Sequence, residues 1–78
     1  MSRLPVVPFR TMDKLLKLAG FEPVRQKGSH VFYRRVSDGK TTTLPNHGNQ
    51  DIARPLIREI LRETEMTPEQ YLELLKKV

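Results

Sequence analysis

The segment 25–35, with the sequence RQKGSHVFYRR, combines a histidine with a cluster of cations. His30 follows a Gly-Ser pair, with Arg25 and Lys27 before it and Arg34 and Arg35 after it. Nearby positive charge disfavours the protonated form of an imidazole, which suits a group that must accept a proton near neutral pH. His30 is therefore the first candidate for a catalytic residue.

The residues before His30 have the properties of a phosphate-binding site. Gly28 allows the backbone to approach a ligand closely or to adopt a positive φ, and Ser29 adds a hydroxyl. Arg25 and Lys27 lie on the same side of an extended strand, so both can point at one anion. If that anion is an RNA phosphate, His30 can take the proton of the 2′-hydroxyl while the cations stabilise the transition state, with no metal or cofactor.

His30 also fits a structural role, as a polar residue that opens a strand and bonds to backbone or water. From spacing alone this structural interpretation is favoured. Strict alternation places His30 on one strand face with Phe32 and Arg34 and the intervening residues on the other. Both faces mix apolar and charged residues, so the pattern does not decide which one is core. A bulge at Gly28 and Ser29 would also shift the register.

Supporting contacts are expected from the loop PNHGN and from the end of the histidine strand. His47 can bind phosphate or help to position RNA, although a histidine in such a loop commonly stabilises a turn. Asn49, Arg34 and Arg35 are further candidates for contacts to RNA or to a protein partner. A metal held by both histidines is not favoured, because no carboxylate or cysteine accompanies them at ligand spacing. We predict neither a metal nor a cofactor.

A second cationic feature lies nearer the C-terminus. Arg54, Arg58 and Arg62 recur every four residues and line one face of a helix. Such a stripe can contact phosphates, but Glu59 and Glu63 dilute it, so a solvated face explains it equally well.

The spacing of apolar residues predicts the elements that must position these side chains. A helix begins near Phe9, and Gly20 supplies its left-handed end. The segments FEPVRQK, HVFYRRV and KTTTL have the composition of strands, with Val24 as the apolar centre of the first and Pro23 marking it as an edge. Helical spacing returns in RPLIREILRE and in TPEQYLELLKKV, where Thr67 opens a capping box.

The predicted order is one helix, three strands and two helices. We expect an α+β fold in which a three-stranded antiparallel sheet is covered by helices on one face, α-β-β-β-α plus a short C-terminal helix. The 78 residues, 37% of them hydrophobic, suit one domain over residues 1–78 with a small core.

Charge and composition limit the classes of partner. Fourteen Lys and Arg against nine Asp and Glu give a formal charge of +5, which favours an anionic partner such as nucleic acid or an acidic protein. No apolar run has the roughly 20 residues of a membrane-spanning helix, and the first residues lack the apolar region of a signal peptide. We expect a cytoplasmic protein without membrane contact. The absence of cysteine excludes disulfides and thiolate metal sites.

Several segments together resemble the HicA toxins of bacterial and archaeal toxin-antitoxin pairs. These segments are LPVV, the helix ending in LAGFE, VRQKGSH, the turn SDGK, and LPNHGN before the helix IREILRE. The resemblance runs from Leu4 to about Leu75, and the order and spacing of the segments are more specific than any one of them.

The resemblance implies a fold like that of a double-stranded RNA-binding domain and the activity of an mRNA interferase that halts translation. The catalytic histidine of the family lies in the motif matched by Gly28, Ser29 and His30. The family also implies an antitoxin, HicB, that covers the active site and often represses the operon. DNA would then be contacted only indirectly, through the antitoxin.

The departures from the family pattern lie at helix ends. Pro8 stands where many relatives have a small polar residue, Pro55 where glycine is common, and Thr64 and Glu65 where an Ala-Gly pair is frequent. We expect them to affect local geometry more than catalysis, because the GSH and HGN segments are intact.

The leading hypothesis is a metal-independent endoribonuclease toxin. In it His30 is the general base or acid, Arg25 and Lys27 hold the scissile phosphate, and Gly28 and Ser29 shape its approach. A single-stranded message fits better than a duplex, because the attacking 2′-hydroxyl must line up with its leaving group. The alternatives are a non-catalytic RNA-binding module of the same fold, and a protein that binds only an acidic partner.

Overall fold

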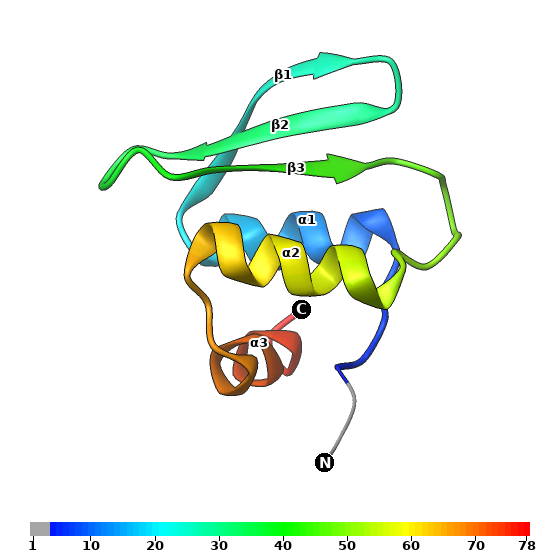
Figure 1. Cartoon of the computed structure of the whole chain (residues 1–78), viewed down its shortest axis with the longest axis vertical. Helices are drawn as coiled ribbons and strands as arrows, with labels where there is room; N and C mark the ends of the chain where they lie inside the picture. The colour runs from blue at the N-terminus through cyan, green and yellow to red at the C-terminus, as the bar shows by residue number, and fades with distance from the viewer. Residues whose placement is uncertain (1–3) are drawn as a thin grey trace.

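The computed structural model describes residues 4–78, and its elements follow the predicted order (Figure 1). The helices are α1 (Phe9–Leu18), α2 (Arg54–Thr64) and α3 (Pro68–Leu75). The strands are β1 (Phe21–Lys27), β2 (His30–Arg35) and β3 (Thr41–Pro45). The expected arrangement of one helix, three strands and two helices is confirmed.

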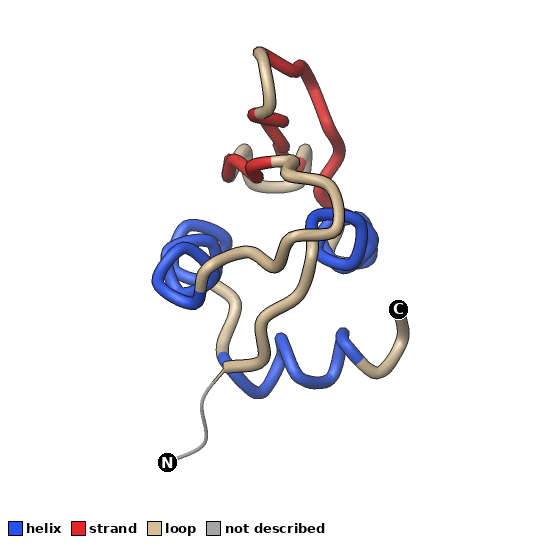
Figure 2. The backbone as a smooth tube through the Cα atoms, turned by 90° about the vertical axis from the view of Figure 1, so that its right-hand side faces the viewer, coloured by secondary structure: helices blue, strands red, loops and turns tan. Residues whose placement is uncertain are grey.

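The strands form one antiparallel sheet in the order β1-β2-β3, so the histidine strand β2 is central. Figure 2 shows α1 and α2 side by side beneath the sheet, with α3 below them on the side away from the strands. Within residues 4–78, no helix covers the opposite face of the sheet (Figure 2). The predicted α+β fold is confirmed and is consistent with that of a double-stranded RNA-binding domain.

The core lies between the sheet and helices α1 and α2, and it extends to α3. Val31 and Tyr33 of β2 and Leu44 of β3 are buried. They belong to one cluster with buried helix residues, namely Met12, Leu15, Leu16, Ile57, Ile60, Leu61 and Tyr71. Burial, together with a hydrogen bond from the Tyr33 hydroxyl to Asp13, raises the pKa of Tyr33. The strand face of Val31 and Tyr33 is therefore the core face, which alternation alone left undecided.

Strand β1 reaches the core only at its first residue. Phe21 is buried, whereas Val24 is 58% exposed, so the prediction that Val24 is the apolar centre of this strand is wrong. The cause is a bulge: the register shifts between Pro23 and Arg25, which leaves Val24 without a partner on β2. Pro23 does lie on an edge strand, as predicted.

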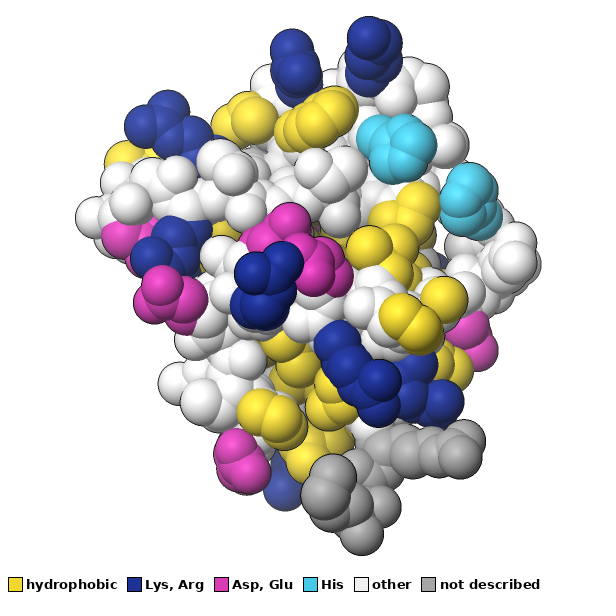
Figure 3. Space-filling view, in the orientation of Figure 1, with side chains coloured by type: hydrophobic (Ala, Val, Ile, Leu, Met, Phe, Trp, Pro, Cys, Tyr) yellow, Lys and Arg dark blue, Asp and Glu magenta, His cyan; other side chains and the backbone are white. Residues whose placement is uncertain are grey.

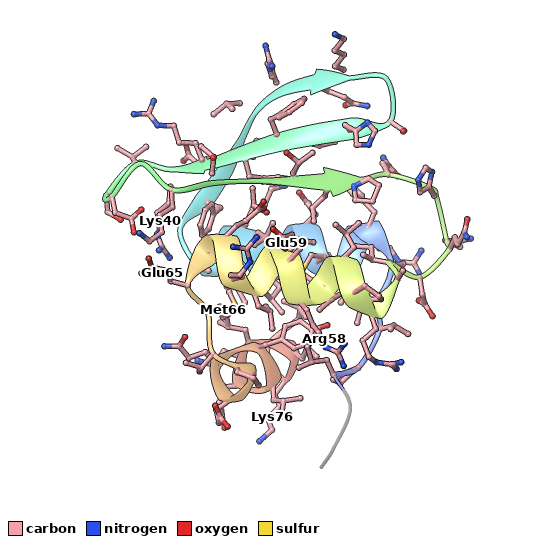
Figure 4. All side chains as sticks on the ribbon, in the orientation of Figure 1. Lys40, Arg58, Glu59, Glu65, Met66 and Lys76 are labelled. Carbon is pink, nitrogen blue, oxygen red and sulfur yellow. The ribbon has the colours of Figure 1, made fainter. Side chains whose placement is uncertain are left out.

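Two helix ends show how local chemistry sets the boundaries. Thr67 and Gln70 form the predicted capping box at the start of α3, with each side chain accepting a hydrogen bond from the other residue's backbone N–H. Helix α2 ends at Thr64, and the capping residue Glu65 has a left-handed φ of 56°, a conformation that favours glycine. Figure 4 shows Lys40 beside Glu65, and their charged groups lie 3.2 Å apart.

Candidate active site

The sheet face that the helices leave bare carries the candidate catalytic residue His30 and three of the four cations that surround it in the sequence. Directly paired residues of neighbouring strands project to the same side, and Val31 and Tyr33 occupy the core side. The alternate residues of β2 and their partners therefore form the opposite side, called here the outer sheet face. It has three rows across the strands: Glu22 with Arg34 and Thr41, Arg25 with Phe32 and Thr43, and Lys27 with His30 and Pro45.

His30 is exposed at the start of β2 and lies directly opposite Lys27 of β1. Arg25 belongs to the next row of the same face, so three of the residues predicted for catalysis and phosphate binding share one surface. Within residues 4–78, neither Arg25 nor Lys27 forms an ion pair. Their charges are therefore available to an external anion.

The bulge in β1 is what brings the two cations to the side of His30. Phe21 faces the core, and strict alternation along β1 would place Arg25 and Lys27 on the core side as well. The extra residue Val24 reverses the alternation after Pro23. Bulges commonly redirect side chains next to functional sites, and here one strand serves the core at its start and the outer face at its end.

Gly28 and Ser29 form the two-residue turn that joins β1 to β2. Gly28 has a φ of +59°, and a Cβ built on it would meet no atom within 4 Å. Glycine is thus favoured by backbone conformation rather than by lack of space. The carbonyl of Ser29 accepts a hydrogen bond of 2.6 Å from the backbone N–H of Asn46. This bond holds the turn against the loop that follows β3.

That loop places His47 at the same end of the sheet as His30. His30 pairs with Pro45, and His47 follows two residues later. The side chain of Asn46 accepts a hydrogen bond from the N–H of Gly48 and so shapes the loop. Figure 3 shows the histidine side chains next to each other on the surface, with Lys or Arg side chains above them. The structure therefore brings both histidines into one region.

Asn49 is tied to the helical layer. Its side-chain oxygen accepts a hydrogen bond from the guanidinium of Arg10 on α1. This contact fastens the loop that carries His47 to the first helix. Asn49 remains a predicted supporting residue, and its observed contact is one that positions the loop.

The neighbouring arginines of β2 lie on opposite faces. Arg34 is exposed on the outer sheet face, opposite Glu22, and forms no ion pair with any residue in the range 4–78. Arg35 lies on the core side, with its guanidinium 4.6 Å from the centre of the Phe21 ring. The structure thus separates Arg35 from His30 and leaves Arg34 on the same surface as it.

Arg35 uses its donors within the protein. It donates to the carbonyls of Ala19 and Thr64, at the ends of α1 and α2, at 3.2 and 3.4 Å. It also forms a two-oxygen ion pair with Asp38, with a closest distance of 2.8 Å. The hydrogen bond from Arg35, partly offset by desolvation and helped by the N–H of Lys40, lowers the pKa of Asp38 to about 2. Arg35 therefore connects the sheet to two helix ends.

Phe32 is the outer-face residue that the sequence analysis did not select. Its ring is half-buried on the side away from the core, and the guanidinium of Arg25 lies over it at 4.6 Å from the ring centre. Alternation already placed Phe32 on the face of His30. The available signal was therefore only an aromatic residue on the same strand face as the candidate catalytic histidine, because the sequence did not show which face is the core.

The second cationic feature, on α2, is partly occupied by internal contacts. Arg54 donates to the carbonyl of Leu4, and Arg62 forms an ion pair with Glu59. Figure 4 shows Arg58 on the side of α2 that is turned away from the strands. This stripe therefore does not extend the outer sheet face.

Other candidate sites lie elsewhere or lack the necessary residues. A pocket of about 640 Å³ lies at the far end of the sheet from His30, between the β2–β3 turn, Met66 and α3. Its lining includes Arg35, Asp38 and Glu65, and no outer-face residue is among the described residues that line it. In the part of the chain that the structure describes, no three His, Asp or Glu side chains gather as metal ligands would. No helix within residues 4–78 is long and apolar enough to cross a membrane.

The fold and the outer sheet face define a small, basic α+β protein with an exposed histidine among cations. Residues 9–66 match the family model of the HicA toxin of bacterial toxin-antitoxin systems, which is more than half of the chain. The chain therefore belongs to the HicA toxin family. The match begins and ends inside the range over which the sequence resembles the family, and it contains the whole outer sheet face. Membership of this family implies an antitoxin partner. No curated protein matches the chain.

Proposed function

We propose that the protein is an mRNA interferase, an endoribonuclease that cleaves RNA without a metal and so halts translation. The observation that carries this proposal is the pairing of His30 with Lys27 on an exposed sheet face, with Arg25 in the adjacent row. Neither cation has an ion-pair partner within residues 4–78. A general base and two free positive charges next to each other are what cleavage of a phosphodiester by its own 2′-hydroxyl requires.

In the proposed reaction the imidazole of His30 takes the proton from the 2′-hydroxyl. The 2′-oxygen then forms a bond to phosphorus, the bond from phosphorus to the 5′-oxygen breaks, and the 5′-oxygen takes a proton from water. The hydroxide left by that water takes the proton from the His30 imidazolium, which restores the general base. Lys27 and Arg25 stabilise the extra negative charge on the non-bridging oxygens. Gly28 and Ser29 hold the turn from which His30 projects. Each turnover leaves a cyclic phosphate on one fragment and a hydroxyl on the other.

The test is cleavage of a long RNA by the purified protein in the presence of a chelator. We expect His30→Ala to fold and to lose about 10²–10⁴-fold in rate, the usual contribution of a positioned acid or base. His47→Ala is the comparison variant, because it removes an imidazole with a predicted supporting role from the same end of the sheet, and it should lose less rate than His30→Ala. A substrate with a 2′-deoxyribose at the cleaved position should resist the wild type. Full cleavage and growth arrest by His30→Ala would rule out this assignment.

The antitoxin is proposed to be of the HicB type and to act by covering the outer sheet face. Within residues 4–78, the face carries three cations without an ion pair and one carboxylate, Glu22, so an acidic surface would complement it. Co-expression with the product of the adjacent gene should remove the growth arrest caused by the wild type. DNA would be bound through the antitoxin alone.

A non-catalytic RNA-binding module is the second candidate. The outer-face cations Arg25, Lys27 and Arg34 favour it, because phosphate binding needs cations and needs no histidine. Under this alternative the wild type and His30→Ala would bind RNA equally well, and neither would cleave it. The same chelated reaction therefore separates the two candidates.

A further inference from the structure

We propose that Arg25 and Phe32 form a platform on which an unpaired base of the RNA stacks, beside the cleavage centre. This inference rests on the proposed function, because it takes RNA as the ligand of the outer sheet face. It adds the way in which a single-stranded substrate is held, with one unstacked base on the outer sheet face. It also gives Phe32 a role that no catalytic step requires.

The position of Phe32 is the first observation. The core lies on the other face of β2, so burial among the apolar residues of the core does not account for this aromatic ring. Its cross-strand neighbours are Arg25 on β1 and Thr43 on β3. The guanidinium of Arg25 lies over the ring, 4.6 Å from its centre, which is within the range of cation–π contact.

The second observation is a comparison with the other arginine that lies over a phenylalanine. Arg35 lies over Phe21 at the same 4.6 Å, but its donors are used by Asp38 and by two backbone carbonyls. Arg25 is exposed and makes no such contact with any residue of the range 4–78. The Arg35–Phe21 pair therefore has its guanidinium donors bonded within the protein, whereas the Arg25–Phe32 pair presents its guanidinium to solvent.

A guanidinium held on an aromatic ring is a suitable surface for a nucleobase. Bases of single-stranded RNA stack on aromatic rings and on arginine planes, and they do so with little regard to base identity. A base in a duplex is already stacked between its neighbours and is not free to do this. The platform therefore selects an unpaired nucleotide rather than a particular sequence.

The register places this platform next to the proposed catalytic group. Phe32 and His30 are two residues apart on the same strand face, which corresponds to about 6.5–7 Å. Arg25 and Lys27 have the same relation on β1. For a base stacked on Arg25, we place the adjoining ribose and phosphate at the neighbouring row of Lys27 and His30, where the proposed general base lies. The stack would hold the nucleotide in the extended arrangement that attack by a 2′-hydroxyl needs.

The experiment measures binding in a full-length His30→Ala background, so that cleavage does not interfere. The probes are a short single-stranded RNA, the same strand lacking one base, and the intact strand annealed to its complement. Phe32→Leu keeps an apolar side chain of similar size without the ring, and Arg25→Lys keeps the charge without the plane. Arg34→Lys is the matched control, since it makes the same change on the same face away from an aromatic ring. Thermal unfolding checks that each variant is folded.

We expect the His30→Ala protein, without further substitution, to bind the intact strand about 5- to 150-fold more tightly than the strand lacking the base, as the loss of one stacked base predicts. Phe32→Leu and Arg25→Lys should each abolish most of this ratio, and Arg34→Lys should retain it. An unchanged ratio in folded Phe32→Leu would overturn the platform, while RNA cleavage by the wild type would still support the proposed function. If the wild type cleaved no RNA and neither it nor His30→Ala bound any, both the platform and the proposed function would be overturned.

Discussion

The two adjacent arginines of β2 provide a sharp test of the structure, because they differ in the face on which they lie. Arg35→Gln and Arg34→Gln remove one positive charge each from neighbouring positions of the same strand. We predict that Arg35→Gln lowers the free energy of unfolding by about 2–3 kcal/mol. Arg34→Gln should change it by no more than about 0.5 kcal/mol, as is usual at exposed positions.

The magnitude follows from the contacts of Arg35. The hydrogen bonds to the carbonyls of Ala19 and Thr64 are charge-assisted but long, at 3.2 and 3.4 Å, so about 1 kcal/mol each is reasonable. The cation–π contact with Phe21 adds about 0.5–1 kcal/mol. The ion pair with Asp38 is solvent-exposed and is left out of the sum. For a domain of this size, the total corresponds to a fall in Tm on the order of 10–20 °C.

The measurement is urea and thermal unfolding of the wild type and both variants, followed by circular dichroism. Binding of a single-stranded RNA gives the opposite ranking, because Arg34 lies on the outer sheet face and Arg35 does not. Arg34→Gln should therefore weaken RNA binding more than Arg35→Gln does at a temperature where both are folded. Equal losses of stability in the two variants, or a destabilised Arg34→Gln with an intact Arg35→Gln, would refute the assignment of faces.

Three further predictions concern charge and backbone strain. The hydrogen bond from Arg35 lowers the pKa of Asp38 to about 2, so the contribution of Asp38 to the free energy of unfolding is present above about pH 4 and is lost towards pH 2. The free energy of unfolding of Arg35→Gln should therefore change less between pH 4 and pH 2 than that of the wild type. Burial raises the pKa of Tyr71 to about 12, and that of Tyr33 is also raised. Stability from both is therefore complete below about pH 10 and falls as pH rises further, and phenolate absorbance should appear together with the loss of structure. Glu65→Gly should have a free energy of unfolding about 1 kcal/mol higher than that of Glu65→Ala. Both variants remove the carboxylate, but only glycine adopts the left-handed φ of 56° without strain. Equal stability of the two variants would exclude backbone strain at this position.

The helices could be predicted from the sequence because their signals are local. Apolar spacing and the left-handed Gly20 define α1, and Thr67 with Gln70 defines the start of α3. Each of these signals acts within about one turn of the chain, so no knowledge of the rest of the fold is needed. At Gly28 the sequence predicted only that a positive φ is permitted, and Gly28 does have one. The two-residue turn with Ser29, which sets the pairing of Lys27 with His30, was not predicted, and the bulge considered there lies at Val24 instead.

The direction of the His30 side chain could not be predicted, because it depends on contacts between distant segments. Arg35 made the core face of β2 look as polar as the outer face. In the structure its guanidinium reaches Ala19 and Thr64, carbonyls that are 16 and 29 residues away along the chain. A charged residue is tolerated on the core side because those two helix ends supply acceptors for it. Nothing within the strand itself indicates that such acceptors are present.

The bulge in β1 resolves a conflict within that strand. Phe21 and Lys27 are six residues apart, an even number, so a regular strand would place both on one face. The fold requires Phe21 in the core, and the two-residue turn requires Lys27 to pair with His30 on the outer face. Both conditions are met only if one residue is inserted between them, and Val24 is that residue. The side chain of Val24 is exposed because one short strand holds both a core residue, Phe21, and a proposed phosphate-binding residue, Lys27. This explains why the apolar residue in the middle of the strand is the one without a partner on β2.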